Sequence, residues 1–398
     1  ARGPWHPPPR MHRPMETLSW KKRLVYSLLM LLVALVLLEL GLQGINLVKK
    51  WRKGGDGEDN RLARLSIYKD VPWAREYMRE FARIKARPAP FYEWRKEGFQ
   101  GKYINISPEG VRRTWNPEFA GKNPAKTVFC FGGSVMWGFG ARDDFTIASL
   151  LSRKLNREEP RYQVVNHGEL AYIFTQEIVY LLLLLKEGKI PDYVVFFDGV
   201  NDVYGAYQNG KPAYTHNFDI TRKKLKLSTG ALFSQMLADA IDNNILTYKL
   251  VKQAFGRFGT PKGIAGLAAS AYNDDQLLQL AQDIVTDYEK NLELVKALAK
   301  TYGFRYYCFW QPMLFSTAAL TEEERNFAAF KDKKWVFLQR QVDSLIKKKH
   351  YEHFVNLSGI FDNKQETVYL DFSHLSEAGN EQVAEAMYQV IRRSALHE

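Results

Sequence analysis

The feature that most constrains this chain is an alternation of two patterns between residues 127 and 393. Short runs rich in β-branched and aromatic residues predict five buried strands, at 127–131, 162–166, 192–198, 304–310 and 353–357. Between and after them, helical periodicity predicts helices at 144–156, 175–187 and 274–301, and one that begins at Glu377. Strands that alternate with helices form a parallel sheet covered on both faces. The sequence therefore predicts an α/β fold, a three-layer α/β/α sandwich with a central parallel sheet.

Residues 24–48 are almost entirely apolar, and Glu39 is the charged residue among them. A helix of this length spans roughly 37 Å, enough for a hydrocarbon core of about 30 Å. We expect one N-terminal transmembrane helix, an uncleaved signal anchor, because the run is long and no small-x-small cleavage site follows it. A cleaved signal peptide and a buried soluble helix are the alternatives. Lys and Arg flank both ends, so the positive-inside rule only weakly favours a cytoplasmic N-terminus.

Composition divides the chain into four parts. Residues 1–23, rich in Pro, are expected to be a disordered cytoplasmic tail, and residues 24–48 the anchor. Residues 49–126 are expected to be a linker and an N-terminal helical extension, with amphipathic helical material at 65–100. The α/β domain then covers 127–398, with an insertion at about 203–290 that we interpret as a lid or a substrate-binding segment.

Charge and cysteine content exclude several classes of partner. The formal net charge is +12, but the basic residues are dispersed and no nucleic-acid-binding module accompanies them, so no nucleic-acid partner is predicted. Cys130 and Cys308 both lie in predicted buried strands, which favours two inert core thiols over a disulfide. His, Cys and carboxylate residues show no metal-ligand spacing, so no metal or other cofactor is predicted.

Polar blocks follow four of the predicted strands, where parallel α/β sheets bind their ligands. In chain order they are Gly132-Gly133-Ser134, Asn166-His167-Gly168, Gly199-Val200-Asn201-Asp202 and Asp371-Phe372-Ser373-His374. Each block on its own is also a common turn sequence. Their shared position at one edge of the sheet is what makes them a candidate site.

The side chains in these blocks suit nucleophilic catalysis. A tight glycine turn exposes the hydroxyl of Ser134 at the start of a helix, where N–H groups and the helix dipole stabilise an anion. Asp371 lies three residues before His374, so its carboxylate can hold the imidazole Nδ1–H and leave Nε2 as a base. The N–H of Gly168 and the side-chain amide of Asn201 are suitable donors to an oxyanion.

Taken together and in this order, the four blocks resemble those of the SGNH hydrolases, also called the GDSL esterase/lipase family. The resemblance covers about residues 127–393, and the third and fourth blocks are its most specific part. Gly133 stands where the family name has Asp, which makes this chain a Gly-Gly-Ser variant. Trp310-Gln311-Pro312 and the acidic helix start at 321–324 also resemble membrane-anchored bacterial members. The α/β-hydrolase motif Gly-x-Ser-x-Gly is a poorer match, because residue 136 is Met.

The resemblance implies a flavodoxin-like fold and a serine esterase. Ser134, His374 and Asp371 would form the catalytic triad, and the Ser134 and Gly168 N–H groups with the Asn201 amide would form the oxyanion hole. The implied substrate is an acyl ester, O-acetyl groups included, on an extracytoplasmic glycan or a lipid, without a cofactor. An O-acyltransferase with the same triad and a non-catalytic glycan-binding or assembly protein are the alternatives. The sequence does not indicate the acyl group, the acceptor or the oligomeric state.

Overall fold

The computed structural model describes residues 19–52, 61–119, 124–158, 160–216, 218, 245–246, 268–329 and 332–395. The chain divides into two compact units, one of residues 1–56 with 227–261 and one of residues 57–226 with 262–398. In the first unit the long helix is α1 (Trp20–Arg52). The second unit contains the central sheet and the candidate site.

Helix α1 includes the whole apolar segment predicted at 24–48. Its residues Trp20–Val48 are long and apolar enough to cross a membrane, and their apolar side chains are exposed rather than packed in a core. This exposure disfavours the buried soluble helix among the three interpretations. A membrane anchor and a signal sequence both have the observed properties.

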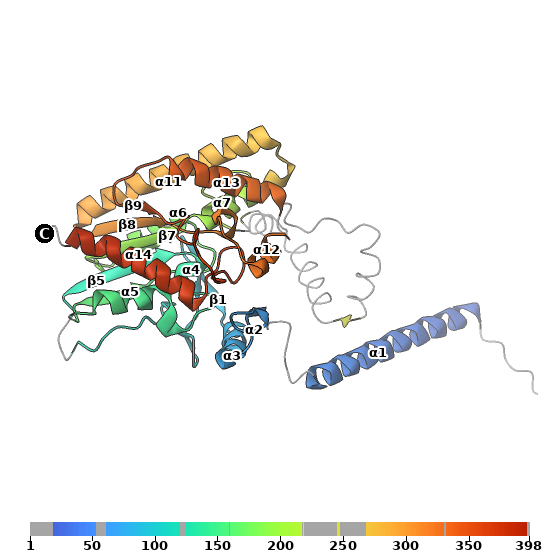
Figure 1. The fold of residues 1–398 in the computed structure, drawn as a ribbon. Coiled ribbons are helices and arrows are strands. Elements are labelled where there is room, and N and C mark those ends of the chain that lie inside the picture. Colours follow the sequence, from blue (N-terminus) through green and yellow to red (C-terminus); the bar gives the residue numbers. More distant parts are fainter. Residues whose placement is uncertain are drawn as a thin grey trace, which may run out of the picture. The chain divides into compact units, whose positions relative to one another are not determined.

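A parallel sheet of five strands forms the middle layer of the second unit, in the order β6-β5-β7-β8-β9 (Figure 1). The strands are β5 (Lys126–Gly132), β6 (Tyr162–Asn166), β7 (Tyr193–Asp198), β8 (Arg305–Trp310) and β9 (Phe354–Asn356). Each agrees with its predicted run to within one residue at either end. All residues of the central strand β7 are buried, which explains why its sequence is continuously apolar rather than alternating.

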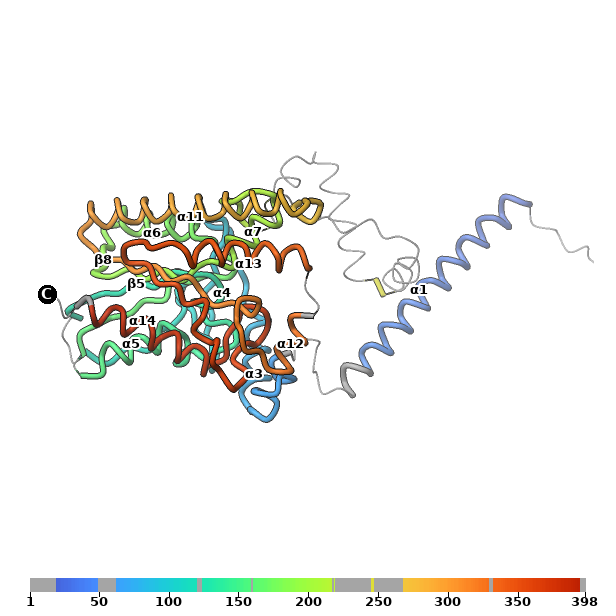
Figure 2. The backbone as a smooth tube through the Cα atoms, turned by 45° about the horizontal axis from the view of Figure 1, so that its top comes forward, coloured from blue at the N-terminus to red at the C-terminus, as the bar shows by residue number. Residues whose placement is uncertain are grey.

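Helices cover the sheet on both faces, as Figure 2 shows. One face carries α6 (Phe174–Lys186), α7 (Val200–Asn209), α11 (Asp274–Tyr302) and α13 (Lys333–Lys347). The other face carries α5 (Ile147–Leu155) and α14 (Glu377–Ala395). With its strands numbered along the chain, the sheet has the order 2-1-3-4-5 of flavodoxin-like folds. The predicted three-layer α/β/α architecture is therefore confirmed.

Shorter elements connect these layers. They are the one-turn helix α4 (Ser134–Trp137), the helix α12 (Glu322–Ala329) and 3₁₀ turns at Asp143–Phe145, Ala268–Ala271 and Leu314–Ser316. Cys130 and Cys308 are buried and free, as predicted.

The segment before the sheet differs from the prediction of helical material at 65–100. Helices α2 (Arg61–Arg64) and α3 (Pro72–Phe81) are followed by strands β1 (Ala86–Ala89), β2 (Glu93–Lys96), β3 (Phe99–Gln100) and β4 (Asn105–Ile106). The helical prediction is wrong from residue 86 onward because Pro88 and Pro90 lack the N–H that a helix interior requires. Two antiparallel pairs, β1 with β2 and β3 with β4, form instead.

The excursion between the core helices is shorter than the predicted insertion at 203–290. Helix α7 extends to Asn209 and α11 begins at Asp274, so the excursion covers 210–273. Its stretches 219–244 and 247–267 lie outside the described residues.

A small apolar cluster joins the N-terminal segment to the site. Its buried members from that segment include Tyr77 and Ile104. The same cluster contains Trp137, three residues after Ser134, and Leu370, the residue before Asp371. The N-terminal segment therefore packs against both loops that carry the candidate site.

Candidate active site

The turn between β5 and α4 places Ser134 at the carboxyl edge of the sheet. Strand β5 ends at Gly132, Gly133 is the N-cap residue, and Ser134 is the first residue of α4. A Cβ at position 132 would lie 2.8 Å from the carbonyl oxygen of Phe197 on the neighbouring strand. Glycine is therefore required there for the chain to turn from strand to helix without displacing β7.

Ser134, His374 and Asp371 form a continuous chain of hydrogen bonds, although Ser134 and His374 are 240 residues apart. The Nε2 of His374 lies 2.7 Å from the Oγ of Ser134, and its Nδ1 lies 2.7 Å from the Oδ2 of Asp371. The other carboxylate oxygen, Oδ1, accepts the backbone N–H groups of Ser373 and His374, both at 2.9 Å. Three donors thus surround the Asp371 carboxylate and hold the imidazole in one orientation.

The Asp371 carboxyl is held in its ionised form. Burial on its own raises its pKa, but the charge and hydrogen bond of His374 and the two backbone N–H groups outweigh burial, and the pKa lies well below its usual range. An acceptor-only carboxylate requires the proton of the imidazole to be on Nδ1, which leaves Nε2 to accept the Ser134 hydroxyl proton.

The imidazole of His374 is partly exposed, at 17% of its side chain. The ring of Phe139 lies 4.5 Å from it between centroids, and Phe81 of α3 packs on Phe139 at 4.9 Å. One side of the imidazole is therefore covered by an aromatic wall that the N-terminal segment supports, while the remaining side is accessible to a substrate.

Two of the three predicted oxyanion donors lie at the nucleophile turn. As the first residue of α4, Ser134 has no carbonyl four positions earlier within the helix to receive its N–H. The Nδ2 of Asn201 lies where a side chain on Gly133 would be, and it donates to the carbonyl of Tyr172 at 2.8 Å. The Asn201 amide therefore lies directly beside Gly133, the residue that precedes Ser134.

Gly168, the third predicted donor, is placed differently. Its N–H donates to the Oδ1 of Asn166 at 3.0 Å, and a Cβ on it would lie 2.7 Å from the N of Trp137. The backbone of Gly168 thus packs directly on α4, which explains the glycine, but its N–H is bonded to a side chain.

Asn166 and Arg112 contact the same helix and were not singled out from the sequence. The Nδ2 of Asn166 donates to the carbonyl of Met136 at 2.9 Å, and Arg112 bonds to the carbonyls that follow. Asn166 stands inside the second block, so its position at a strand end was a usable signal. Arg112 stands among other basic residues before the sheet, and nothing in the local sequence distinguishes it.

Three carboxyl groups lie behind the Asn201 loop: Glu177 on α6 and Asp198 at the end of β7 are buried, and Asp202 on α7 is half-buried. Glu177 and Asp198 face each other, and burial together with this repulsion raises the pKa of Glu177 well above its usual value. Burial likewise raises the pKa of Asp198. Burial raises the pKa of Asp202 to about 7, although its Oδ1 accepts the N–H of Phe174 at 3.0 Å. These shifts favour the protonated forms of all three carboxyl groups.

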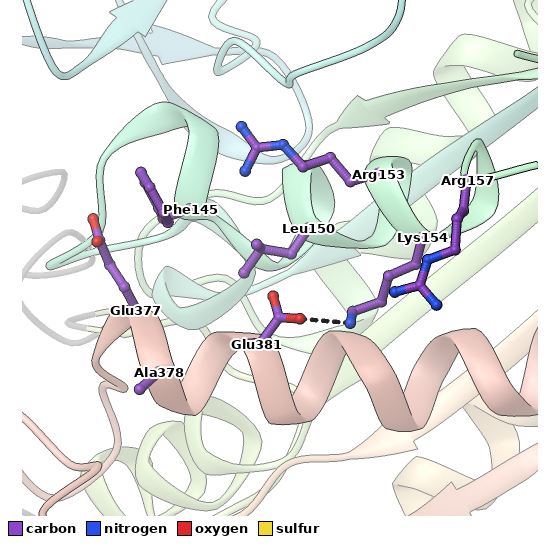
Figure 3. Close-up of a pocket in the computed structure, with 8 residues that line it drawn as sticks. All are labelled: Phe145, Leu150, Arg153, Lys154, Arg157, Glu377, Ala378 and Glu381. Atoms are coloured by element: carbon purple, nitrogen blue, oxygen red, sulfur yellow. Dashed lines mark hydrogen bonds and ion pairs between the residues drawn. The ribbon is translucent and has the colours of Figure 1, made fainter.

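A cavity of about 510 Å³ lies elsewhere, between α5 and α14 (Figure 3). Its lining includes Arg153, Lys154, Glu377 and Glu381 but none of the three hydrogen-bonded residues. The Nζ of Lys154 bonds to Glu381 at 2.6 Å, so cations and carboxylates neutralise each other across the cavity. Within the described ranges, no group of three or more His, Cys, Asp or Glu side chains is arranged to hold a metal ion.

No protein-family model and no curated protein sequence matches the chain. Similar solved structures include a carbohydrate acetylesterase family member from Sinorhizobium meliloti, 14% identical with a TM-score of 0.35, over 67% of this chain and 98% of that one. The acetyl xylan esterase AlAXEase is 15% identical with a TM-score of 0.35 (67% and 99% covered). An M. smegmatis aryl esterase is 16% identical with a TM-score of 0.32 (68% and 99%).

Proposed function

We propose that this chain is a serine ester hydrolase of the SGNH type. Its substrates would be acyl esters, O-acetyl groups included, on an extracytoplasmic glycan or a lipid. The observation that supports this most directly is the unbroken hydrogen-bond chain from Ser134 through His374 to Asp371. A hydroxyl, an imidazole and an ionised carboxylate in this order are the components of an activated serine nucleophile.

In the acylation step, the Oγ of Ser134 attacks the ester carbonyl and His374 Nε2 takes the hydroxyl proton. Asp371 stabilises the imidazolium that forms. The negative charge that develops on the carbonyl oxygen is met by the Ser134 N–H and by the Asn201 amide. Collapse of the tetrahedral intermediate breaks the bond to the alcohol, which leaves with the proton from His374, and an acyl-serine remains.

In the deacylation step, water attacks the acyl-serine while His374 again takes a proton. The bond to Ser134 Oγ then breaks, the carboxylic acid leaves, and the hydroxyl of Ser134 recovers its proton. If the hydroxyl of a sugar replaced water, the same groups would catalyse acyl transfer. We assign hydrolysis, because it requires no second binding site for an acceptor.

The location we propose is a single-pass membrane protein with α1 as its anchor and the α/β unit outside the cytoplasm. Support comes from the exposed apolar surface of Trp20–Val48, which water would solvate poorly. Protease added to sealed spheroplasts should digest the α/β unit. Full protection of that unit would contradict the orientation.

The function is tested with a fluorophosphonate probe and a p-nitrophenyl ester series of increasing acyl length. The wild-type chain should be labelled at Ser134 and should hydrolyse the short esters. Ser134→Ala should abolish both activities. Ser373→Ala is a matched control in the block that carries Asp371 and His374, since the backbone N–H of Ser373 rather than its hydroxyl contacts Asp371. Labelling that survives in Ser134→Ala would exclude Ser134 as the nucleophile.

A further inference from the structure

Helix α4 is too short to be stable alone. It is a single turn, Ser134–Trp137, and a turn of this length does not recover the cost of helix nucleation. The carbonyls at its C-terminal end also need partners from outside the helix. Because Ser134 is its first residue, whatever fixes the direction of α4 also fixes the direction of the Ser134 hydroxyl.

The side chain of Arg112 provides several of these partners. Its Nη1 donates to the carbonyls of Trp137, at 3.0 Å, and Gly138, at 2.6 Å. Its Nη2 donates to the carbonyl of Ala141 at 2.7 Å. The guanidinium also stacks over the indole of Trp137, 4.2 Å from the ring centre. One buried cation therefore binds the last residue of α4 and the turn that follows it.

Arg112 is itself held in place by three elements. Its side chain is fully buried, and its Nε donates to the Oδ1 of Asp143 at 3.1 Å. Its backbone forms antiparallel bridges to Ile106 of β4 and to Asn166 at the end of β6. A buried ion pair with this many hydrogen bonds has a fixed geometry, since any shift would leave a charge or a carbonyl without a partner.

We propose that Arg112 is a positioning residue for Ser134. It acts through α4 by holding the carbonyls of Trp137 and Gly138, so that the hydroxyl of Ser134 stays in line with His374. The inference rests on the proposed function, in which Ser134 is the nucleophile. It also makes the segment around residues 61–116 part of the active unit rather than a linker to the membrane.

A guanidinium is suited to this role and an ammonium is not. The planar fork of Arg directs several N–H donors to separate carbonyls, whereas Lys offers a compact charge on a flexible stem. We therefore expect Arg112→Lys to keep the charge beside Asp143 but to release part of the turn. A displacement of about 1 Å in a reacting group costs roughly 100-fold in rate.

The test compares Arg112→Lys and Arg112→Gln in the full-length chain, solubilised in detergent. Arg113→Gln is the matched control, because Arg113 is the next residue and is half-exposed. Its guanidinium bonds to Asp144 at 3.0 Å and lies 3.9 Å from Asp143, instead of contacting the carbonyls of the turn. We would measure kcat and KM on p-nitrophenyl acetate, the rate of fluorophosphonate labelling and Tm. Titration with the probe to completion counts active sites, so an unfolded fraction does not lower kcat.

For Arg112→Lys we expect kcat and the labelling rate to fall roughly 10- to 100-fold with KM unchanged, and Arg113→Gln to match the wild type. In Arg112→Gln, kcat and the labelling rate should fall at least as far. A purely structural role would instead lower Tm and leave kcat per titrated site intact, and that result in folded Arg112→Lys would overturn the proposal. Wild-type protein that neither reacts with the probe nor hydrolyses esters would refute the proposed function, independently of any comparison between the variants.

Discussion

The side-chain amide of Asn201 occupies the space that a side chain at Gly133 would need. A Cβ built on Gly133 overlaps with the Nδ2 of Asn201. The backbone φ of Gly133 is −73°, which any residue can adopt, so the glycine is not required by the turn itself. Its role is to let the amide approach the nucleophile turn. The second glycine of the Gly-Gly-Ser sequence thus has a structural counterpart in the position of Asn201.

The first prediction concerns this contact. Gly133→Ala and Gly133→Asp should push the Asn201 amide away from the turn and lower kcat by roughly 10- to 100-fold, with KM little changed. The reason is that a misplaced oxyanion donor stabilises the transition state less, while the binding of the substrate is hardly affected. Gly359→Ala is the control, since Gly359 is exposed and a Cβ there meets only the flexible carboxylate of Asp362. Wild-type kcat in Gly133→Ala would show that the amide does not need this space.

The second prediction concerns Asn201 itself. Removal of an oxyanion donor should lower kcat by roughly 10²–10³ with little change in KM, so Asn201→Ala should show this pattern. Asn201→Asp should be at least as damaging, because a carboxylate repels the oxyanion and cannot donate. Asn209→Ala on the same helix is the control, since the Asn209 amide bonds to Gly205 and Thr215, away from the turn.

Tm measured in parallel separates this role from a structural one. The Nδ2 of Asn201 also donates to the carbonyl of Tyr172, so some loss of Tm is expected in both variants. A stable Asn201→Ala protein with near-wild-type kcat would remove Asn201 from the site.

Much of the fold could be predicted because strand and helix periodicities are local properties. The run DYVVFFD predicted β7 to within one residue, and the buried position of β7 explains its continuous apolar character. The hairpin strands β1 and β2 were missed. Their sequence has helical amphipathicity interrupted by Pro88 and Pro90. These prolines cannot donate the backbone hydrogen bonds of a helix interior, and strands form instead.

The candidate site was predictable to the extent that its residues follow strands. Ser134, His374 and Asp371 could be proposed together because parallel strands end at one edge of a sheet. The hydrogen bond from the Gly168 N–H to the Asn166 side chain could not be predicted. This N–H can donate either to the Oδ1 of Asn166 or to a substrate oxyanion, and the choice depends on backbone geometry that a local sequence pattern does not show. Arg112 was missed for a related reason, because its partners are backbone carbonyls, which every residue has.

The third prediction concerns truncation. Removal of residues 1–56 deletes α1 and should give a soluble protein with wild-type kcat per titrated site, because the site residues and their supports begin beyond it. Removal of residues 1–116 should abolish activity, since it deletes Arg112 and the Tyr77 hydroxyl that accepts the N–H of Gly140 at 2.8 Å. Comparable activity in the two truncated proteins would contradict a role for the segment 61–116.

The fourth prediction concerns the pH dependence of stability, through Asp202. Its folded-state pKa of about 7 lies above the value of about 3.9 in an unfolded chain. Between these two values the folded protein binds more protons than the unfolded one, so this carboxyl lowers the free energy of unfolding as pH rises from about 4 to 7. Asp202→Asn stays neutral and can still accept the N–H of Phe174. We therefore expect the variant to gain Tm relative to the wild type at pH 8 but not at pH 4.

Asp192 provides a control of opposite sign. Burial raises its pKa, but hydrogen bonds from Thr127 and Lys126 outweigh burial and lower it. A lowered pKa contributes stability that is present above the unfolded value and is lost as pH falls through the folded value. Asp192→Asn should therefore lose Tm relative to the wild type at pH 8 and approach it in acid. Tm recorded from about pH 2 to 8.5 for the three proteins measures both signs, because the Asp192 contribution is lost only below about pH 4. If the wild type and Asp202→Asn had parallel profiles, folding would not raise the pKa of Asp202, and the Asn201 loop would adjoin an ionised Asp202 rather than a protonated one.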